Sequence, residues 1–279
     1  MKGILYIVST PIGNLEDITA RALRILGEVD LIAAEDTRRS LKLLNHYRIS
    51  KPMISYWREK EKGRSEEIMK RLNAGQSVAL ISDAGTPGIS DPGSVLIRKA
   101  VEENIRIIPI PGPSAFLAAL SVSGLPTDEF TFIGFLPSKK TRRQGVLQEL
   151  SLEQKTLIFY EAPHRVLEVL MEMEVLFPER NAVLIKEITK IHEEVLRGTI
   201  SGIRMQLQQS TIAGEYVLII EGRKPERAFT IADVIPEISH LMKKGFGRKE
   251  AAKKIAEAYG LSKKELYDKS LDESLDEIP

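Results

Sequence analysis

The fold class is indicated most clearly by residues 78–93, which have the sequence VALISDAGTPGISDPG. The apolar run Val78–Ser82 is typical of a buried β-strand. The loop Ser82–Gly93 that follows holds three glycines, two prolines, two carboxylates and three hydroxyl groups. A connection from a strand to a helix needs only about two to six residues. A loop of this length and composition therefore predicts a ligand-binding segment rather than a simple turn, with Asp83 and Asp91 as groups that could hold hydroxyls or an amine.

Apolar runs and amphipathic segments alternate on both sides of this loop. The expected strands are Ile4–Ser9, Leu31–Ala34, Met53–Tyr56, Val78–Ser82 and Ile105–Ile110. The expected helices are Ile18–Leu26, Arg38–His46, Ser65–Asn73 and Ser94–Glu103. Alternation of this kind predicts an α/β fold with a largely parallel sheet.

Two more loops follow expected strands. Ser9–Asn14 comes after the first strand, and Pro109–Ala115 comes after the last, with Ser114 placed to cap the next helix. Ser9–Asn14 matches neither the phosphate-binding loop nor the dinucleotide fingerprint, and each of the two loops taken alone fits an ordinary turn equally well. Because open parallel sheets bind ligands at the carboxyl ends of their strands, the three loops together predict one shared pocket.

The chain changes character at the turn-rich segment Gly124–Asp128, where we expect a domain boundary. A second α/β unit with some antiparallel pairing is expected beyond it, after which Gly222–Glu226 suggests a hinge. The basic segment Ser138–Arg143 is expected to be a loop. The elements of the second unit are Phe130–Phe135, Thr156–Tyr160, Val166–Phe177, Ala182–Ile188, Val195–Thr199, Ile203–Leu207 and Tyr216–Ile220. The predicted domains are residues 1–124, 125–224 and 225–279.

The last segment predicts a small helical appendage that resembles a helix-turn-helix. Its expected helices are Ile231–Lys243, Arg248–Tyr259 and a third that begins at Lys263 with Ser262 as its N-cap, although Pro236 makes the first turn uncertain. Residues 241–259 contain six basic and two acidic residues. Such runs are often only solvated helix faces, but on an appendage of this kind they favour contact with RNA phosphates. The acidic tail after Glu265 explains why the net charge is only +1.

The composition excludes several classes of protein and site. The sequence has no cysteine, so disulfides, thiolate nucleophiles and cysteine-bound zinc are absent. The apolar start, Ile4–Val8, is too short for a signal peptide, and no run reaches the roughly 18 apolar residues of a membrane span. Two aspartates without a third ligand do not indicate a metal site. A cytoplasmic protein without a membrane partner is the expectation.

Seven segments resemble, in the same order, those of the tetrapyrrole methylase superfamily of S-adenosylmethionine-dependent enzymes. They are Tyr6–Leu15, Ala34–Arg38, Ser82–Gly93, Pro109–Ala115, Phe132–Pro137, Phe159–Arg165 and Lys186–Lys190. The resemblance implies two α/β domains with S-adenosylmethionine in the cleft between them. It implies cofactor contacts at Ile12, Asp83, Thr86, Ser114, Ala115, Tyr160, Ala213 and Gly214.

Within the superfamily, the chain resembles members that methylate ribosomal RNA. This implies transfer to the 2′-hydroxyl of a cytidine in 16S rRNA of the 30S subunit, by a homodimer. A ribose hydroxyl is a weak nucleophile that needs a base or a nearby cation. Charged groups at strand ends are the candidates, among them Glu161, and the leading ones are Glu35 and His164 as the base and Lys186 as a cation that lowers the pKa of the hydroxyl.

The basic residues of the appendage, a basic loop and a pair after the second strand are the predicted RNA contacts. They are Arg38, Arg39, Lys139, Lys140, Arg142, Arg143, Lys243, Lys244, Arg248, Lys249, Lys253 and Lys254. Trp57 and Tyr56 could stack a base, although a half-buried aromatic pair at a strand end is the commoner arrangement. Two other functions remain open from the sequence: methylation of a tetrapyrrole ring, and a non-catalytic protein that binds rRNA during assembly.

Overall fold

The computed structural model describes residues 1–224 and 230–272. The chain forms two compact units, residues 1–223 and residues 224–279. Of the expected hinge at 222–226, Pro225 and Glu226 lie outside the described residues, as does the end of the acidic tail. None of the helices in the described ranges is long and apolar enough to cross a membrane.

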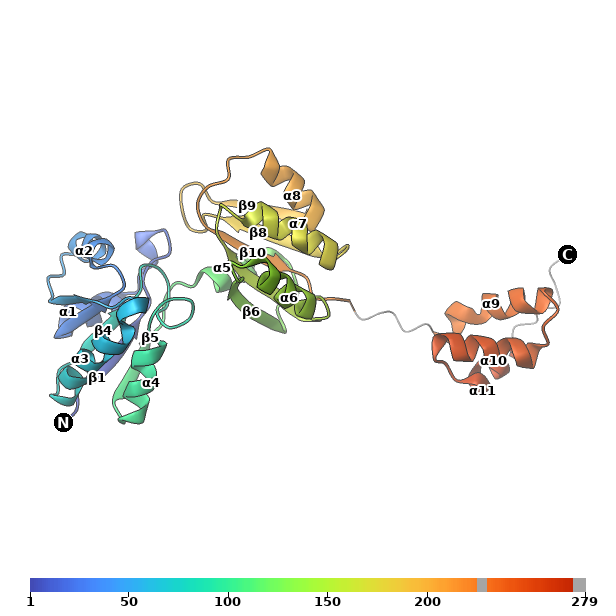
Figure 1. Ribbon diagram of the computed structural model, residues 1–279, viewed down its shortest axis with the longest axis horizontal. Coiled ribbons are helices and arrows are strands. Elements are labelled where there is room, and N and C mark those ends of the chain that lie inside the picture. Colours follow the sequence, from blue (N-terminus) through green and yellow to red (C-terminus); the bar gives the residue numbers. More distant parts are fainter. Residues whose placement is uncertain (225–229, 273–279) are drawn as a thin grey trace. The chain divides into compact units, whose positions relative to one another are not determined.

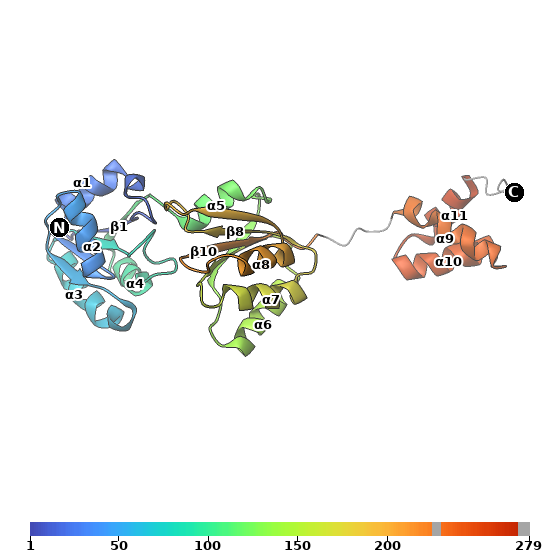
Figure 2. The ribbon, with the colours of Figure 1, turned by 90° about the horizontal axis from the view of Figure 1, so that it is seen from above.

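The first sheet, whose strand β1 is labelled in Figures 1 and 2, is parallel. Its strand order is β3-β2-β4-β1-β5. Its strands are β1 (Ile4–Val8), β2 (Leu31–Ala34), β3 (Met53–Ser55), β4 (Val78–Ile81) and β5 (Arg106–Ile110). Four helices cover it: α1 (Ala20–Glu28), α2 (Thr37–His46), α3 (Glu61–Asn73) and α4 (Ser94–Glu102). Each of β2 and β4 is buried along its whole length. The predicted α/β class is confirmed.

The helices of this half lie on both faces of the sheet. Ile25 and Leu44, from α1 and α2, pack with Ile32 on one face. Ile68 and Leu96, from α3 and α4, belong to the cluster on the other face. Thr19 caps α1 by accepting a hydrogen bond from the Ala22 amide (3.1 Å). A sheet covered in this way leaves the loops at the carboxyl ends of its strands free to bind a ligand.

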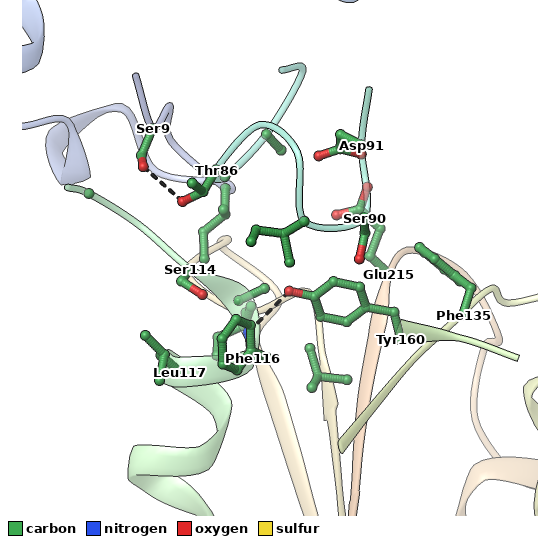
Figure 3. A pocket seen from close by; sticks show the side chains of 18 of the residues that line it. Ser9, Thr86, Ser90, Asp91, Ser114, Phe116, Leu117, Phe135, Tyr160 and Glu215 are labelled. Atoms are coloured by element: carbon green, nitrogen blue, oxygen red, sulfur yellow. Dashed lines mark hydrogen bonds between the residues drawn. The ribbon is translucent and has the colours of Figure 1, made fainter. Parts of the chain in front are cut away.

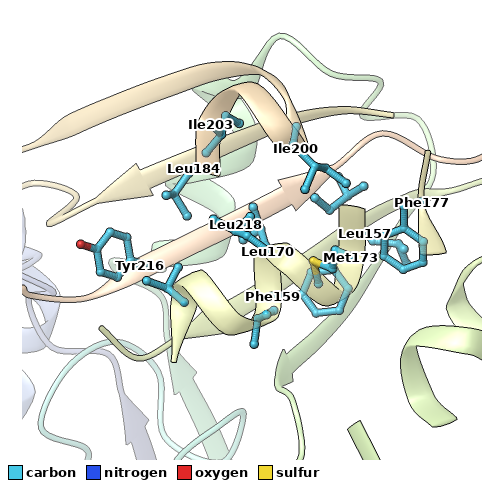
Figure 4. Packing of buried hydrophobic residues seen from close by; sticks show 14 of the residues in the cluster. Leu157, Phe159, Leu170, Met173, Phe177, Leu184, Ile200, Ile203, Tyr216 and Leu218 are labelled. Atoms are coloured by element: carbon cyan, nitrogen blue, oxygen red, sulfur yellow. The ribbon is translucent and has the colours of Figure 1, made fainter. Parts of the chain in front are cut away.

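The second sheet is mixed, with the strand order β6-β7-β10-β8-β9. Its strands are β6 (Phe130–Phe135), β7 (Thr156–Glu161), β8 (Asn181–Lys186), β9 (Glu194–Thr199) and β10 (Tyr216–Ile220). The β6–β7 pair is parallel and the other pairs are antiparallel, as the sequence suggested. One face carries α6 (Lys140–Leu150), α7 (Val166–Leu176) and α8 (Ile200–Gln208) over the apolar cluster shown in Figure 4.

The other face of this sheet is covered by α5 (Ala115–Ser123). Ala119 and Leu120 of α5 pack with Ile158 and Ile219 of the sheet. Helix α5 precedes the expected boundary at residue 124, yet its apolar side belongs to the second sheet. The loop that joins β5 to α5 therefore runs from one sheet to the other.

Helix α6 corrects one expectation, because the segment 138–143 was expected to be a loop. The helix begins at Lys140 without a side-chain cap, so the usual sequence signal for a helix start is missing. Its stability comes from Leu147, which is buried in the core, and from Arg143, which forms ion pairs with α7. Those partners are distant in the sequence and cannot be inferred from the local pattern.

The C-terminal unit contains α9 (Ile231–Lys243), α10 (Arg248–Tyr259) and α11 (Lys263–Asp272). A capping box fixes the first turn of α9: the Asp233 amide donates to Thr230 Oγ1 (3.3 Å), and the Thr230 amide donates to Asp233 Oδ2 (2.8 Å). The helix continues through Pro236. Val234, Ile255 and Leu266 from the three helices share one small core.

Candidate active site

A cavity of about 590 Å³ lies where the predicted loops of the first sheet face the second sheet. All three loops that the sequence singled out contribute to its wall, through Ser9 and Ile12, through Ala84–Thr86 and Ile89–Asp91, and through Pro109–Gly112 and Ser114–Ala115. The second sheet adds further residues, which include Phe135, Tyr160–Pro163, Ile188 and Gly214–Val217. The expected shared pocket is therefore present.

Backbone contacts hold the first two loops together. Thr10 and Gly85 exchange amide-to-carbonyl hydrogen bonds of 2.9 and 3.0 Å. The hydroxyls of Ser9 and Thr86 lie 2.8 Å apart and form a hydrogen bond (Figure 3). The third loop packs closely against the first, because a Cβ atom at Gly112 would lie 2.9 Å from the Cβ of Ser9. This part of the wall is consequently backbone that is fixed from several sides.

Close packing also joins the first loop to the second half of the cavity. A Cβ atom at Gly13 would lie 2.5 Å from Lys190 Cγ and 2.7 Å from Thr189 Oγ1. Gly214 has φ of +86°, and a Cβ there would lie 2.4 Å from Glu187 Oε1. That same Glu187 oxygen accepts a hydrogen bond from the Glu215 amide (2.9 Å). Glycine is needed at position 13 for the first loop to approach the second half, and at position 214 for the turn before Tyr216 to pack against Glu187 within that half.

The labelled side chains of Figure 3 form two groups on either side of Tyr160. One group contains the hydroxyls of Ser9, Thr86 and Ser114, and we call it the hydroxyl end. The other contains Ser90, Asp91, Glu215 and the ring of Phe135, and we call it the acidic end. The Tyr160 hydroxyl accepts a hydrogen bond from the Phe116 amide (3.3 Å) in the first turn of α5. The Ser114 side chain makes no capping hydrogen bond to that helix.

Two carboxyl groups near the acidic end have raised pKa values. Burial raises the pKa of Asp91, and the neighbouring carboxylate of Asp83 adds to the effect. Burial also raises the pKa of Glu35, whose Oε2 accepts a hydrogen bond from the Asp83 amide (3.3 Å). Asp83 itself forms an ion pair with Arg39 (3.2 Å) and accepts from the Asp36 amide (3.0 Å). Asp83 thus supports the loop from behind, whereas Asp91 lines the cavity.

Glu161 also contributes a carboxyl group to the cavity wall, besides Asp91 and Glu215, and it is 2% exposed. Its Oε1 forms an ion pair with Arg165 and accepts from the Ala162 amide (3.0 Å). Its Oε2 has no hydrogen-bond partner among the described residues. The ion pair holds this side chain in place, so Glu161 has little freedom to follow a substrate.

Six of the cofactor contacts that the resemblance implied line the cavity: Ile12, Thr86, Ser114, Ala115, Tyr160 and Gly214. Asp83 and Ala213 do not line it but adjoin residues that do. The candidates for the base are placed elsewhere. His164 is exposed, the Lys186 ammonium donates to the Thr211 carbonyl (2.8 Å), and Glu35 lies behind the loop at Asp83. None of these three lines the cavity.

Comparison with known proteins supports the fold and identifies the family. A match to the family described as Tetrapyrrole (Corrin/Porphyrin) Methylases covers residues 4–204. The chain belongs to this family. The expectation drawn from the seven resembling segments is thereby confirmed.

Three relatives within the family cover nearly the whole chain. Proteins of Synechocystis, Halalkalibacterium halodurans and Bacillus subtilis are 48%, 44% and 40% identical to it. They match 97%, 95% and 95% of this chain and 98%, 94% and 93% of their own lengths. Each is named ribosomal RNA small subunit methyltransferase I.

Solved structures of distant family members share the fold. A diphthine synthase aligns over 78% of this chain and 90% of its own, with a TM-score of 0.61 at 14% identity. The uroporphyrin-III C-methyltransferase of Thermus thermophilus, complexed with S-adenyl homocysteine, aligns over 78% and 97% with a TM-score of 0.56 at 16% identity. Both share the fold of this chain over the aligned part.

The cavity of this tetrapyrrole methylase fits S-adenosylmethionine. Its volume is within the range of about 300–1,000 Å³ that is usual for small-molecule sites. Ile7, Ile12, Ile110 and Val217 offer apolar surface for a heterocycle, and the hydroxyl end offers hydrogen-bonding groups. At Gly112 a Cβ would meet Ser9, so glycine there lets the first and third loops of the wall pack closely together. Among the described residues, no group of three acidic or histidine side chains could hold a metal ion.

The predicted RNA contacts of the first unit fall into two classes. Arg38 and Arg39 are 88% and 70% exposed while paired with Asp36 and Asp83, and Lys139, Lys140 and Arg142 are exposed at the start of α6. Arg143 differs, because it is 2% exposed and forms ion pairs with Glu172 (2.7 Å) and Glu168 (2.8 Å). Its expected contact with RNA is wrong, since the guanidinium is fully used inside the protein.

The basic residues of the C-terminal unit are mostly accessible. Lys243, Lys244, Lys249, Lys253 and Lys254 are exposed. The Lys254 ammonium lies 4.6 Å from the centre of the Phe246 ring, and Arg248 is half-buried, donating to the Ser270 carbonyl (2.6 Å). Most of the predicted basic surface is therefore available to a polyanion.

At the acidic end, the sequence singled out the loop that contains Ser90 and Asp91 but assigned no role to Phe135 or Glu215. Phe135 and Glu215 line the cavity there, while Trp57 and Tyr56, the aromatics considered for base stacking, do not. One signal was available, because Gly134 interrupts the apolar strand Phe130–Phe135, and an isolated glycine in a strand often marks a bulge.

Proposed function

We propose that this chain transfers the methyl group of S-adenosylmethionine to the 2′-hydroxyl of a cytidine in 16S rRNA of the 30S subunit. The observation that carries the proposal is one cavity with two unlike ends, one suited to a cofactor and one to an acceptor. The relatives' shared name supports small-subunit ribosomal RNA as the substrate class. The family supports methyl transfer as the reaction.

In this proposal the hydroxyl end holds the cofactor. Ile12, Thr86, Ser114, Ala115 and Tyr160 are the proposed contacts, with the Ala213–Gly214 turn on the second sheet and Asp83 as support for its loop. When bound, S-adenosylmethionine supplies an activated methyl group on a positively charged sulfur. The residues of the chain mainly have to align two reactants, and the tightly packed loops suit that task because they lose little freedom on binding.

We propose Asp91 as the group that accepts the proton of the ribose hydroxyl. A carboxylate near the reacting oxygen eases formation of the new O–C bond by taking up the proton as it is lost. Asp91 lines the cavity, and its raised pKa brings it nearer to neutral pH than an ordinary aspartate. Glu35, His164 and Lys186 remain predictions from the sequence, and their positions outside the cavity wall favour Asp91 over them.

The RNA itself is proposed to contact exposed cations. These are Arg38, Arg39, Lys139, Lys140, Arg142, Lys243, Lys244, Lys249, Lys253 and Lys254, together with the half-buried Arg248. Contacts of this kind neutralise phosphates and carry no sequence information, so the choice of nucleotide belongs to the cavity. A homodimer and a cytoplasmic location stay predictions; light scattering of the purified protein tests the first, and cell fractionation tests the second.

A transfer assay with three acceptors tests the function. The purified protein is incubated with labelled S-adenosylmethionine and, separately, with 30S subunits, naked 16S rRNA and a tetrapyrrole precursor. We expect label in the RNA and, after nuclease digestion, in 2′-O-methylcytidine. Label in the tetrapyrrole alone would replace the proposal by the second reading, and binding of RNA without label in any acceptor would favour the non-catalytic one.

A further inference from the structure

Strand β6 contains a bulge beside the cavity. In its pairing with β7, Phe132 is opposite Ile158, Gly134 is opposite Phe159 and Phe135 is opposite Tyr160. One extra residue, Ile133, is therefore accommodated in β6. Gly134 has φ of +73° at this point, a conformation that favours glycine.

The bulge determines the face on which Phe135 lies. In a regular strand, residues 132 and 135 would be on opposite faces, and Phe135 would be directed toward the helices α6–α8. With the extra residue, both rings lie on the face of Tyr160, at centroid distances of 5.1 Å for Phe132 and 5.6 Å for Phe135. Bulges next to active sites commonly redirect a side chain in this way.

The redirected ring remains open to solvent. Phe135 is 56% exposed although it lines the cavity, while Phe132 is partly buried and stacks on Phe116 (4.5 Å). Ile89, from the loop after β4, is 59% exposed and lines the same cavity. The opposing loop is close, because a Cβ at Gly134 would lie 3.4 Å from Ser90 Oγ. At the acidic end, the apolar side chains of Phe135 and Ile89 therefore line the opening of the cavity, and the ring of Phe135 is exposed there.

We infer that Phe135 is the platform on which the base of the target nucleotide stacks. An enzyme that acts on one nucleotide has to take it out of its stacked surroundings, and aromatic side chains provide a replacement for the lost stacking. The ring lies on the same side of Tyr160 as Asp91 (Figure 3), so a base held there brings its own ribose toward the carboxylate. The hydroxyl end, on the other side of Tyr160, is left to the cofactor. The inference rests on the proposed function and adds the residue that positions the acceptor.

Substitution of Phe135 tests the platform, with 30S subunits as the substrate. Phe135→Ala and Phe135→Leu should each raise the KM for 30S subunits about ten-fold, because the stacking surface is lost. Phe135→Trp keeps an aromatic face and should stay within about two-fold of the wild type. The Kd for S-adenosylmethionine should not change in any of the three variants.

Two aromatic residues outside the cavity wall serve as matched controls. Phe130 lies on the same strand as Phe135, and Trp57 follows strand β3 of the first sheet. Both side chains are 39% exposed. Phe130→Leu and Trp57→Leu should leave the KM for 30S subunits unchanged. Equal effects of Phe135→Leu and Phe130→Leu, an unchanged KM in Phe135→Ala, or a weakened affinity for S-adenosylmethionine in Phe135→Ala would each overturn the inference.

A spectroscopic measurement separates stacking from a structural role. The double variant Trp57→Phe/Phe135→Trp contains a single tryptophan at the rim, because the sequence has one tryptophan. Stacking of a base should quench its fluorescence when 30S subunits are added, and unchanged fluorescence at saturating 30S subunits would also overturn the inference. If the wild type methylates no RNA at all, the proposed function fails first, and the two failures are thereby distinguished.

Discussion

The hydroxyl end and the acidic end of the cavity are built in different ways. At the hydroxyl end, the wall is backbone from three loops that hydrogen bonds and close glycine contacts hold together. At the acidic end, the wall consists of side chains that extend into the opening, such as Asp91, Glu215 and Phe135. Side chains at the acidic end can be substituted without disturbing the packed loops, whereas the backbone wall of the hydroxyl end cannot be altered in this way. The difference suggests that the shared cofactor requires the rigid end, and that the side-chain end selects the acceptor.

The largest expected effect is at Asp91. Asp91→Asn should lower kcat for methyl transfer to 30S subunits about 10²- to 10⁴-fold, the usual contribution of a general base. The Kd for S-adenosylmethionine should stay within about two-fold of the wild-type value. Single-turnover kinetics and calorimetry provide the two numbers. A kcat that is nearly unchanged would assign the proton to another group.

The pH dependence of the rate follows from the raised pKa of Asp91. Only the ionised carboxylate accepts a proton, so the rate should fall as the pH drops through the pKa of Asp91. Burial raises this pKa, the charges of Asp83 and Glu215 raise it further, and a hydrogen bond from Ser82 and the charge of Arg58 oppose them. The decline should therefore begin at a higher pH than for an ordinary aspartate. A wild-type acid limb that persists unchanged in the residual activity of Asp91→Asn would contradict the assignment.

An intermediate effect is expected at the hydroxyl end. Gly112→Ala places a Cβ 2.9 Å from that of Ser9, and overpacking of this kind costs about 1–3 kcal/mol. The Kd for S-adenosylmethionine should rise about ten-fold as the two loops move apart. Gly27→Ala is the matched control, because a Cβ at Gly27 has nothing within 4 Å. Equal affinities of the two variants would show that the loop contact does not shape the cofactor site.

The smallest effect is expected in the C-terminal unit. Replacing the exposed residues Lys243, Lys244 and Lys249 with alanine should weaken RNA binding and make it less sensitive to salt. Each lost phosphate contact reduces the slope of log K against log salt by about 0.7 to 0.9. The Kd for S-adenosylmethionine should be unaffected. A salt slope equal to that of the wild type would remove these lysines from the RNA-binding surface.

Much of the fold was predictable because its signals are local. Apolar runs gave the strands to within a residue or two at most ends, and the loop Ser82–Gly93 showed by its length that it serves more than a turn. Helix α6 was missed because it lacks a capping side chain. Arg143 was assigned to RNA because its partners Glu168 and Glu172 are 25 or more residues away, where no local pattern reveals them.

The hydroxyl end of the site was predictable from the sequence, and most of the acidic end was not. The hydroxyl end follows from three loops at the ends of parallel strands, a rule that needs only strand order. The acidic end depends on a bulge at Gly134 and on the pairing of β6 with β7, which join residues that are distant in the sequence. The sequence alone therefore pointed to the exposed His164 and the half-buried Glu35 as the base, neither of which lines the cavity, and it gave Phe135 no role.

Calorimetric titration of S-adenosylmethionine into four proteins tests the separation of the two ends most directly. The proteins are the wild type, Gly112→Ala, Asp91→Asn and Phe135→Ala, each without RNA. The account predicts that only Gly112→Ala binds the cofactor more weakly, by about ten-fold. A comparable loss of affinity in Asp91→Asn and Phe135→Ala would contradict it, because the acidic end would then belong to the cofactor site as well.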